Sequence, residues 1–317
     1  MITSVCTARL PAQIRFNLVR RLATSRSSSL HLAPPSTKNT LANKMASQPS
    51  YLIIGAGVFG VSTAYHLIKK YPDASVHLID RTPYPCPLAA SWDWNKVVRA
   101  DYGDLFYMEK ALEAIQLWRN DPMFKPFYHE SGMIKMDNTG LGRTMIANYA
   151  KLGIKVDAEM LSPEAFKKDF GDFFQNTDYT DVEEVFVNRE SGWAEATKAL
   201  AAYTDAAVEA GVKYIPAEVE RLEFDSDGAC MGVRLTDERT VTASRIILST
   251  GAGTAKLLAD SAPDRPDLQV DGRIVAAAVV TAITNLDASE AQMYPQVPVM
   301  VHAIESTRGK FRFYPSS

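Results

Sequence analysis

Three glycines and one aspartate have the residue types and the spacing of a nucleotide-binding site. Gly55, Gly57 and Gly60 follow a short apolar run, and Asp80 lies twenty residues after the last glycine. In such a pattern the first glycine permits a tight turn, the second lets the main chain approach a pyrophosphate, and the third lets a helix pack closely on a strand. The carboxylate accepts hydrogen bonds from ribose hydroxyls. The pattern predicts binding of an ADP moiety, and a glycine-rich turn without a ligand is the alternative.

These residues need a strand, a helix and a second strand to position them. Residues 51–54 predict the first strand, residues 61–68 have helical spacing, and residues 74–79 predict a second strand that ends at Asp80. The amino terminus of that helix would face the anion. Val58, where the turn enters the helix, and Arg81, directly after the acid, complete the expected cofactor-binding residues of this unit. The motif does not distinguish NAD from FAD.

The residues that follow Asp80 separate these two cofactors. Residues 81–87 include three prolines, which do not suit the next helix of a nicotinamide-binding unit. Residues 89–103 then read AASWDWNKVVRADYG, residues 190–194 read ESGWA, and residues 245–253 read RIILSTGAG. In these runs the chain resembles the FAD-dependent amine oxidases, which include monomeric sarcosine oxidase, fructosyl amino acid oxidases, and pipecolate and saccharopine oxidases. The resemblance extends from residue 51 to the end, although Gly253 stands where the family has tryptophan.

The resemblance implies an α/β fold. A Rossmann-like FAD-binding domain of the glutathione reductase and D-amino acid oxidase type would be joined to a discontinuous, mixed-sheet substrate domain. It also implies FAD as the cofactor and a small-molecule amine or amino acid as the substrate. In that reaction the C–N bond of a secondary amine or N-substituted amino acid is oxidised, hydride passes to flavin N5, and O2 takes the electrons to give hydrogen peroxide.

Two basic residues are the catalytic candidates that the resemblance implies. Arg99 is expected to hold a substrate carboxylate in its guanidinium fork, and Lys96 is expected to place a positive charge over the flavin. The alternative for Arg99 is a surface ion pair with Asp101 or Asp104, and the alternative for Lys96 is a solvated side chain.

Further residues are expected near the cofactor. Trp92 and Trp94 would form an aromatic wall beside the site or pack in the core. The resemblance adds four kinds of cofactor contact: from Ser91, from Asn95, from the main chain of Val219, and from the second glycine turn at Gly251 and Ala252.

Composition excludes several other classes of protein. The chain has 317 residues, with 34 basic and 37 acidic side chains. The first 50 residues hold seven of the basic residues and no acidic one, so the other residues hold 27 basic against 37 acidic. That acidic body argues against nucleic-acid binding. No run of 18 apolar residues predicts a membrane span. The spacing of the three cysteines and five histidines predicts neither a disulfide scaffold nor a metal site.

The two ends of the chain carry separate expectations. Residues 1–48 are expected to be a disordered basic arm with the composition of a mitochondrial presequence. A start at Met45 would exclude the arm, and the cytoplasm or the peroxisome would then be the compartment. At the other end, the family pattern stops early, which predicts a chain truncated at its carboxyl terminus. An FAD-binding fragment without turnover is therefore the alternative function.

The expected domains alternate along the chain. Residues 49–117 and 191–260 are assigned to the FAD-binding domain, and residues 118–190 and 261–317 to an incomplete substrate domain. Strands are predicted at 132–136, 185–188 and 275–283, and a helix start is predicted at Ser162. A monomer is expected.

Overall fold

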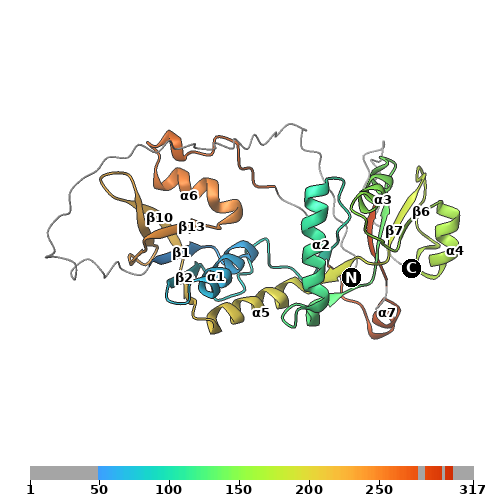
Figure 1. The fold of residues 1–317 in the computed structure, drawn as a ribbon, viewed down its shortest axis with the longest axis horizontal. Coiled ribbons are helices and arrows are strands. Elements are labelled where there is room, and N and C mark those ends of the chain that lie inside the picture. The colour runs from blue at the N-terminus through green and yellow to red at the C-terminus, as the bar shows by residue number, and fades with distance from the viewer. Residues whose placement is uncertain (1–48, 278–282, 295–296, 303–317) are drawn as a thin grey trace, which may run out of the picture.

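The computed structural model describes residues 49–277, 283–294 and 297–302. Its elements form two lobes, one around a parallel sheet and one around a mixed sheet (Figure 1). The arm at 1–48 and the tail at 303–317 lie outside the described residues, so the expectations for them are not addressed by the fold. Among the residues that the structure describes, no helix combines the length and the apolar character needed to cross a membrane.

The first lobe is built on a parallel sheet of strand order β13-β1-β2-β9. The strands are β1 (Ser50–Ile54), β2 (Ser75–Asp80), β9 (Lys213–Pro216) and β13 (Arg245–Leu248). Each neighbouring pair is parallel. A parallel sheet needs cover on both faces, which explains why its strands are apolar on both sides.

Alternate residues of β1 enter different cores on the two faces of this sheet. Ile53 packs with helices α1 (Val58–Lys70) and α5 (Ala196–Glu209). Leu52 and Ile54 pack instead under the antiparallel sheet of β10 (Val219–Phe224), β11 (Cys230–Leu235) and β12 (Thr240–Thr242), together with α6 (Thr254–Ser261). All three β1 side chains are at most 4% exposed. The glycine turn therefore directly follows a strand, β1, that is buried on both faces.

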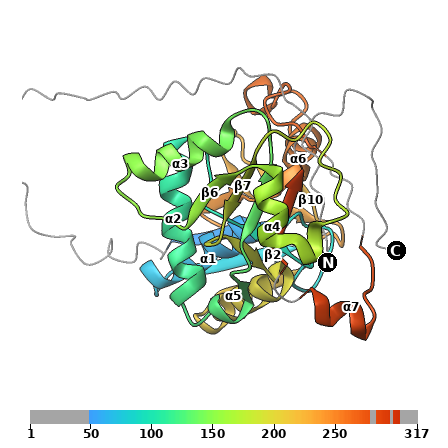
Figure 2. The ribbon, with the colours of Figure 1, turned by 90° about the vertical axis from the view of Figure 1, so that its right-hand side faces the viewer.

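The second lobe is built on a mixed sheet of order β14-β5-β7-β6. Its strands are β5 (Met133–Met136), β6 (Ala158–Leu161), β7 (Val185–Asn188) and β14 (Val299–His302). Helices α2 (Leu105–Asn120) and α3 (Leu141–Lys151) pack with Met133 and Phe186. Helix α4 (Pro163–Phe174) packs with Ile134 and Val187 on the other face. Figure 1 places α3 and α4 on opposite sides of β6 and β7, and Figure 2 looks onto the side that carries α4.

A small antiparallel sheet lies where the chain passes from one lobe to the other. It has the order β3-β8-β4, with β3 (Lys96–Val98), β8 (Gly192–Ala194) and β4 (Tyr128–His129). The remaining described elements are helix α7 (Ala288–Met293) and the 3-10 helices η1 (Lys125–Phe127), η2 (Gly251–Gly253) and η3 (Pro266–Leu268).

The expected fold class is confirmed: a Rossmann-like parallel sheet is joined to a mixed sheet. The strands predicted near 132–136 and 185–188 are β5 and β7. The predicted helix begins after Ser162, whose hydroxyl accepts a hydrogen bond from Ala165 N at 3.2 Å. The strand predicted at 275–283 is wrong where it is described: residues 275–277 have no regular structure and Val275 is 71% exposed. No described strand pairs with it, and residues 278–282 lie outside the described part.

Candidate cofactor and substrate site

The glycine turn has two glycines that the fold itself requires. Gly55 has a φ of +98°, and a Cβ there would lie 2.4 Å from the carbonyl oxygen of Ser249. A Cβ on Gly60 would lie 1.8 Å from the carbonyl oxygen of Gly55. A side chain at Gly55 would therefore collide with the turn after β13, and one at Gly60 would push α1 away from the end of β1, as the pattern predicts for its third glycine.

Gly57 is different, because the fold tolerates a side chain there. Its φ is −70°, and a Cβ would meet only the hydroxyl of Ser91, at 3.2 Å. Without a side chain at Gly57, the main chain at the amino terminus of α1 can be approached closely, as a diphosphate does in this motif.

The first turn of α1 is suited to an anion. Gly57 provides no side-chain cap, and the first turn contains no acidic residue. Phe59 is 81% exposed, so the end of the helix is open to solvent. Ser91 Oγ accepts a hydrogen bond from Val58 N at 2.9 Å, which confirms that the loop after β2 returns to this turn. The N–H groups of the first turn that Ser91 does not bond, together with the helix dipole, favour a bound phosphate.

Asp80 faces the glycine turn from the end of β2. Its two carboxylate oxygens accept hydrogen bonds from Ala56 N and from Arg81 N, each at 2.7 Å. A carboxylate has further lone pairs, which ribose hydroxyls can use. The main-chain oxygen of Asp80 accepts from Ala217 N at 2.7 Å, which places Val219 two residues from this edge of the sheet.

The second glycine turn lies beside the first. Ser249 N donates to Ile54 O at 2.8 Å, so the end of β13 is fixed to the end of β1. Gly251 has a φ of +51°, and both Gly251 and Ala252 are exposed. A Cβ on Gly253, the position at which the resembled family has tryptophan, would meet nothing within 4 Å. Both glycine turns and Asp80 thus meet at the carboxyl edge of the parallel sheet, where α/β proteins bind ligands.

The loop that carries Ser91 continues past two tryptophans to Lys96. Trp92 and Trp94 are 36% and 57% exposed and form an edge-to-face pair, so the alternative of core packing is wrong. Lys96 forms an ion pair with Asp93 at 2.7 Å, and its side chain is 49% exposed. Asn95 lies between these residues and is partly buried.

Arg99 is held by its own segment rather than by an ion pair. Its guanidinium donates to the main-chain oxygen of Asp101 and lies over the ring of Tyr102, 4.3 Å from the centroid. The proposed ion pair with Asp101 or Asp104 is wrong because both carboxylates have other partners. Asp104 caps α2 by accepting from Phe106 N at 2.8 Å. The rest of the guanidinium forms no hydrogen bond with a residue that the structure describes, which leaves it donors for a carboxylate.

The carboxylate of Asp101 is the feature that sequence reasoning missed. Asp101 is fully buried and accepts hydrogen bonds from Tyr149, Asn188 and Ser191. Burial, followed by the negative charge of Asp101, raises the pKa of Tyr149, so this hydroxyl remains a donor. The only signal in the sequence was an acid between Ala100 and Tyr102, and its partners are distant in the chain.

The arrangement fits the ADP half of FAD. A positive helix end, a space at Gly57 and an acid facing that space are the three features that a diphosphate and its ribose need. Of the sequence-predicted residues, Asp80, Ser91 and the two glycine turns form one group. Arg99 lies beyond β3, and no contact between described residues links it to those turns. Nowhere in the described ranges do three His, Cys, Asp or Glu side chains gather to hold a metal ion.

Comparison with known proteins gives the same assignment. The sequence profile of the family described as FAD dependent oxidoreductase matches residues 50–315. L-saccharopine oxidase of Schizosaccharomyces pombe is 28% identical over 265 residues, which cover 78% of this chain and 59% of that protein. Peroxisomal sarcosine oxidase of Homo sapiens is 27% identical and covers 65% of this chain and 51% of its own.

A solved structure of a thermally stable mutant of fructosyl peptide oxidase superposes with a TM-score of 0.67 at 25% identity. That match covers 80% of this chain and 59% of the other chain. The chain therefore spans less than two thirds of the length of these relatives. Because the family profile matches residues 50–315, well over half of the chain, the chain belongs to the FAD dependent oxidoreductase family, whose cofactor is FAD.

Proposed function

We propose that this chain binds FAD along the carboxyl edge of its parallel sheet and oxidises the C–N bond of a carboxylate-bearing amine. The observation that supports FAD binding most directly is the junction of Asp80 with the glycine turn, where the carboxylate accepts a hydrogen bond from Ala56 N at 2.7 Å beside a helix terminus without an acidic residue. The proposal for the substrate rests on Arg99 and on the names of the relatives.

The residues of the chain divide the work between cofactor and substrate. The first turn of α1 binds the diphosphate, Asp80 accepts from the ribose, and the main chain near Val219 approaches the adenine. FAD supplies the hydride acceptor at N5, and O2 takes the electrons to give hydrogen peroxide. Lys96 places a positive charge near the electron-accepting ring. Its bond to Asp93 limits how far the ammonium can move.

Arg99 determines the substrate class in this proposal. Asp101 O and the Tyr102 ring hold the guanidinium from its own segment, so it presents its remaining donors in a fixed direction. A planar guanidinium fork binds both oxygens of a carboxylate. Saccharopine and sarcosine, the substrates in the names of two relatives, are both amines that carry carboxylates. A secondary amine of this kind is the substrate that we propose.

The test is to purify the full chain, titrate it with FAD and then measure peroxide release with sarcosine or saccharopine. Quenching of flavin fluorescence together with peroxide release in air supports the proposal. FAD binding without peroxide from any amine carboxylate would support the alternative, an FAD-binding chain without turnover. No FAD binding would contradict both.

A further inference from the structure

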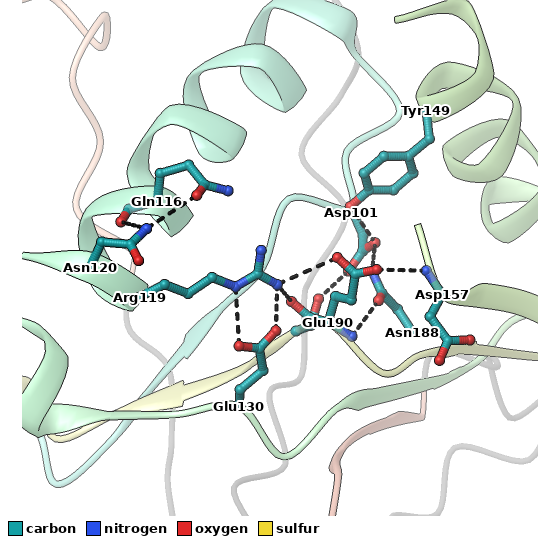
Figure 3. A network of polar contacts seen from close by, with 10 residues as sticks. Asp101, Gln116, Arg119, Asn120, Glu130, Tyr149, Asp157, Asn188 and Glu190 are labelled. Atoms are coloured by element: carbon teal, nitrogen blue, oxygen red, sulfur yellow. Dashed lines mark hydrogen bonds and ion pairs between the residues drawn. The ribbon is translucent and has the colours of Figure 1, made fainter. Parts of the chain in front are cut away.

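The carboxylate of Asp101 joins three separate parts of the chain, and Figure 3 shows its contacts with Tyr149 and Asn188. Asn188 at the end of β7 donates to Oδ1 at 2.6 Å, and Tyr149 of α3 donates to the same oxygen at 3.1 Å. Ser191, in the link to β8, donates to Oδ2 at 2.8 Å. Asp101 and Ser191 are fully buried, and Tyr149 is 3% exposed.

A buried carboxylate without a cation is costly unless hydrogen bonds stabilise it. Among the residues that the structure describes, no Lys, Arg or His forms an ion pair with Asp101. The hydrogen bonds from Asn188, Tyr149 and Ser191 therefore offset the cost of burying this carboxylate. Because leaving any of these buried groups unpaired would be costly, the hydrogen bonds to Asp101 strongly determine the position of its segment.

The same segment is fixed along its main chain. Asn148 of α3 donates to the main-chain oxygens of Tyr102 and Gly103, at 3.2 and 2.9 Å. Asp104 caps α2 directly afterwards. Arg99 closes this set of contacts, because its guanidinium donates to the main-chain oxygen of Asp101 itself. The position of that oxygen therefore depends on the buried carboxylate of the same residue.

We propose that Asp101 is a positioning residue for Arg99: its buried carboxylate fixes the segment 99–104 to α3 and β7 and so aims the guanidinium at the substrate carboxylate. The aiming rests on the proposed function, since it is Arg99 that would bind the substrate. The anchoring of the segment does not depend on that function and can be measured without FAD.

The chain offers a conservative variant and a disruptive one at this position. Asn188 cannot turn its amide over, because its Oδ1 already accepts from Glu190 N at 2.8 Å. In Asp101→Asn the new amide oxygen still accepts from Asn188 and Tyr149, and the new N–H2 donates to Ser191, whose hydroxyl rotates. In Asp101→Ala all three buried donors lose their acceptor.

Asp137 provides a matched control on the same sheet. It is also a buried carboxylate, 4% exposed, and it bonds Lys135 and Thr139 N rather than the segment of Arg99. Asp137→Ala therefore removes a buried acid of the same lobe without touching residues 99–104.

The experiment compares the full chain with these three variants by two readouts that need no turnover. The rate of hydrogen exchange in the peptide spanning 99–104 measures how firmly this segment is anchored. The rate at which phenylglyoxal modifies Arg99, followed by peptide mass, measures how firmly the guanidinium is held. Asp101→Ala should raise both rates by about tenfold or more, which is the loss expected for unsatisfied buried donors. Asp101→Asn should remain close to the parent, and Asp137→Ala should leave both rates unchanged.

Unchanged rates in Asp101→Ala, or an equal rise in Asp137→Ala, would overturn the proposal. The same would follow if the segment exchanged faster while Arg99 kept its parent rate of modification. The proposed function is read separately, from the protection of Arg99 by sarcosine in the FAD-loaded parent. Absence of that protection contradicts the substrate assignment, whereas the comparison of the variants still decides the role of Asp101.

Discussion

Gly57 and Gly60 are both part of the glycine turn, but alanine at the two positions should have different consequences. At Gly57 the new Cβ would lie 3.2 Å from Ser91 Oγ, and the φ of −70° suits alanine. Since a hydroxyl can move a few tenths of an ångström, the free energy of unfolding should stay within about 1 kcal/mol of the parent. The methyl group would, however, occupy the space that the diphosphate of FAD needs.

The expected loss of FAD affinity in Gly57→Ala follows from that crowding. Forcing one extra carbon into a well-packed contact costs about 1–3 kcal/mol, which is roughly a 5- to 150-fold rise in the dissociation constant. Gly60→Ala places a Cβ 1.8 Å from the main-chain oxygen of Gly55, and neither backbone segment can yield easily. That variant should lose more than about 3 kcal/mol of stability as well as FAD binding.

Urea unfolding without FAD and quenching of flavin fluorescence on titration separate the two effects. We expect Gly57→Ala to unfold like the parent and to bind FAD weakly, whereas Gly60→Ala unfolds early. Parent-like FAD affinity in Gly57→Ala would refute the placement of the diphosphate. A loss of stability equal to that of Gly60→Ala would refute the claim that the fold tolerates a side chain there.

Three further predictions address the acid, the arginine and a buried hydroxyl. Asp80→Ala should weaken FAD binding about 10- to 100-fold, the effect of losing charged hydrogen bonds, and equal FAD titrations of parent and variant would contradict this. Arg99→Lys should raise KM for an amine carboxylate by about tenfold with little change in FAD affinity, as steady-state kinetics at saturating FAD would measure, and an unchanged KM would count against it. Burial, followed by the charge of Glu130, raises the pKa of Tyr128 to about 12. In the unfolded chain the tyrosine pKa is about 10. As the pH rises, the unfolded chain therefore releases this proton before the folded chain does, and the parent loses stability between those two pH values. Over that pH range, the free energy of unfolding measured in urea should fall less for Tyr128→Phe than for the parent. An equal fall in the two proteins would contradict this prediction.

The part of the site that sequence predicts is the part that is local in the chain. Gly55, Gly57, Gly60 and Asp80 lie within one strand–helix–strand unit, so their spacing alone predicts that they meet. The structure confirms the meeting through the bond of Asp80 to Ala56 N. Ser91 was predicted from the family resemblance, and its bond to Val58 N supports its place beside the turn.

The surroundings of Arg99 could not be predicted in this way. Asn188 and Ser191 lie 87 and 90 residues from Asp101, and neither residue type reveals its partner. The sequence therefore suggested Asp101 only as an alternative ion-pair partner of Arg99, its charged neighbour. Burial excludes that alternative, because the carboxylate points into the second lobe and only the main-chain oxygen of Asp101 bonds the guanidinium.

The wrong strand at 275–283 has a related cause. An apolar run predicts burial but does not supply a partner strand, and a strand needs one to satisfy its main-chain groups. Where the run is described, at 275–277, its residues are exposed. For Trp92 and Trp94 the sequence left open an aromatic wall beside the site and packing in the core, and both side chains lie at the surface.

The most direct test of the account is anaerobic mixing of the FAD-loaded full chain with sarcosine or saccharopine, followed by the visible absorbance of the flavin. The account predicts that FAD remains bound, that the absorbance of the oxidised flavin disappears on adding the amine, and that air restores it with release of peroxide. Failure to bind FAD, or bound flavin that stays oxidised with every amine carboxylate tried, would contradict it.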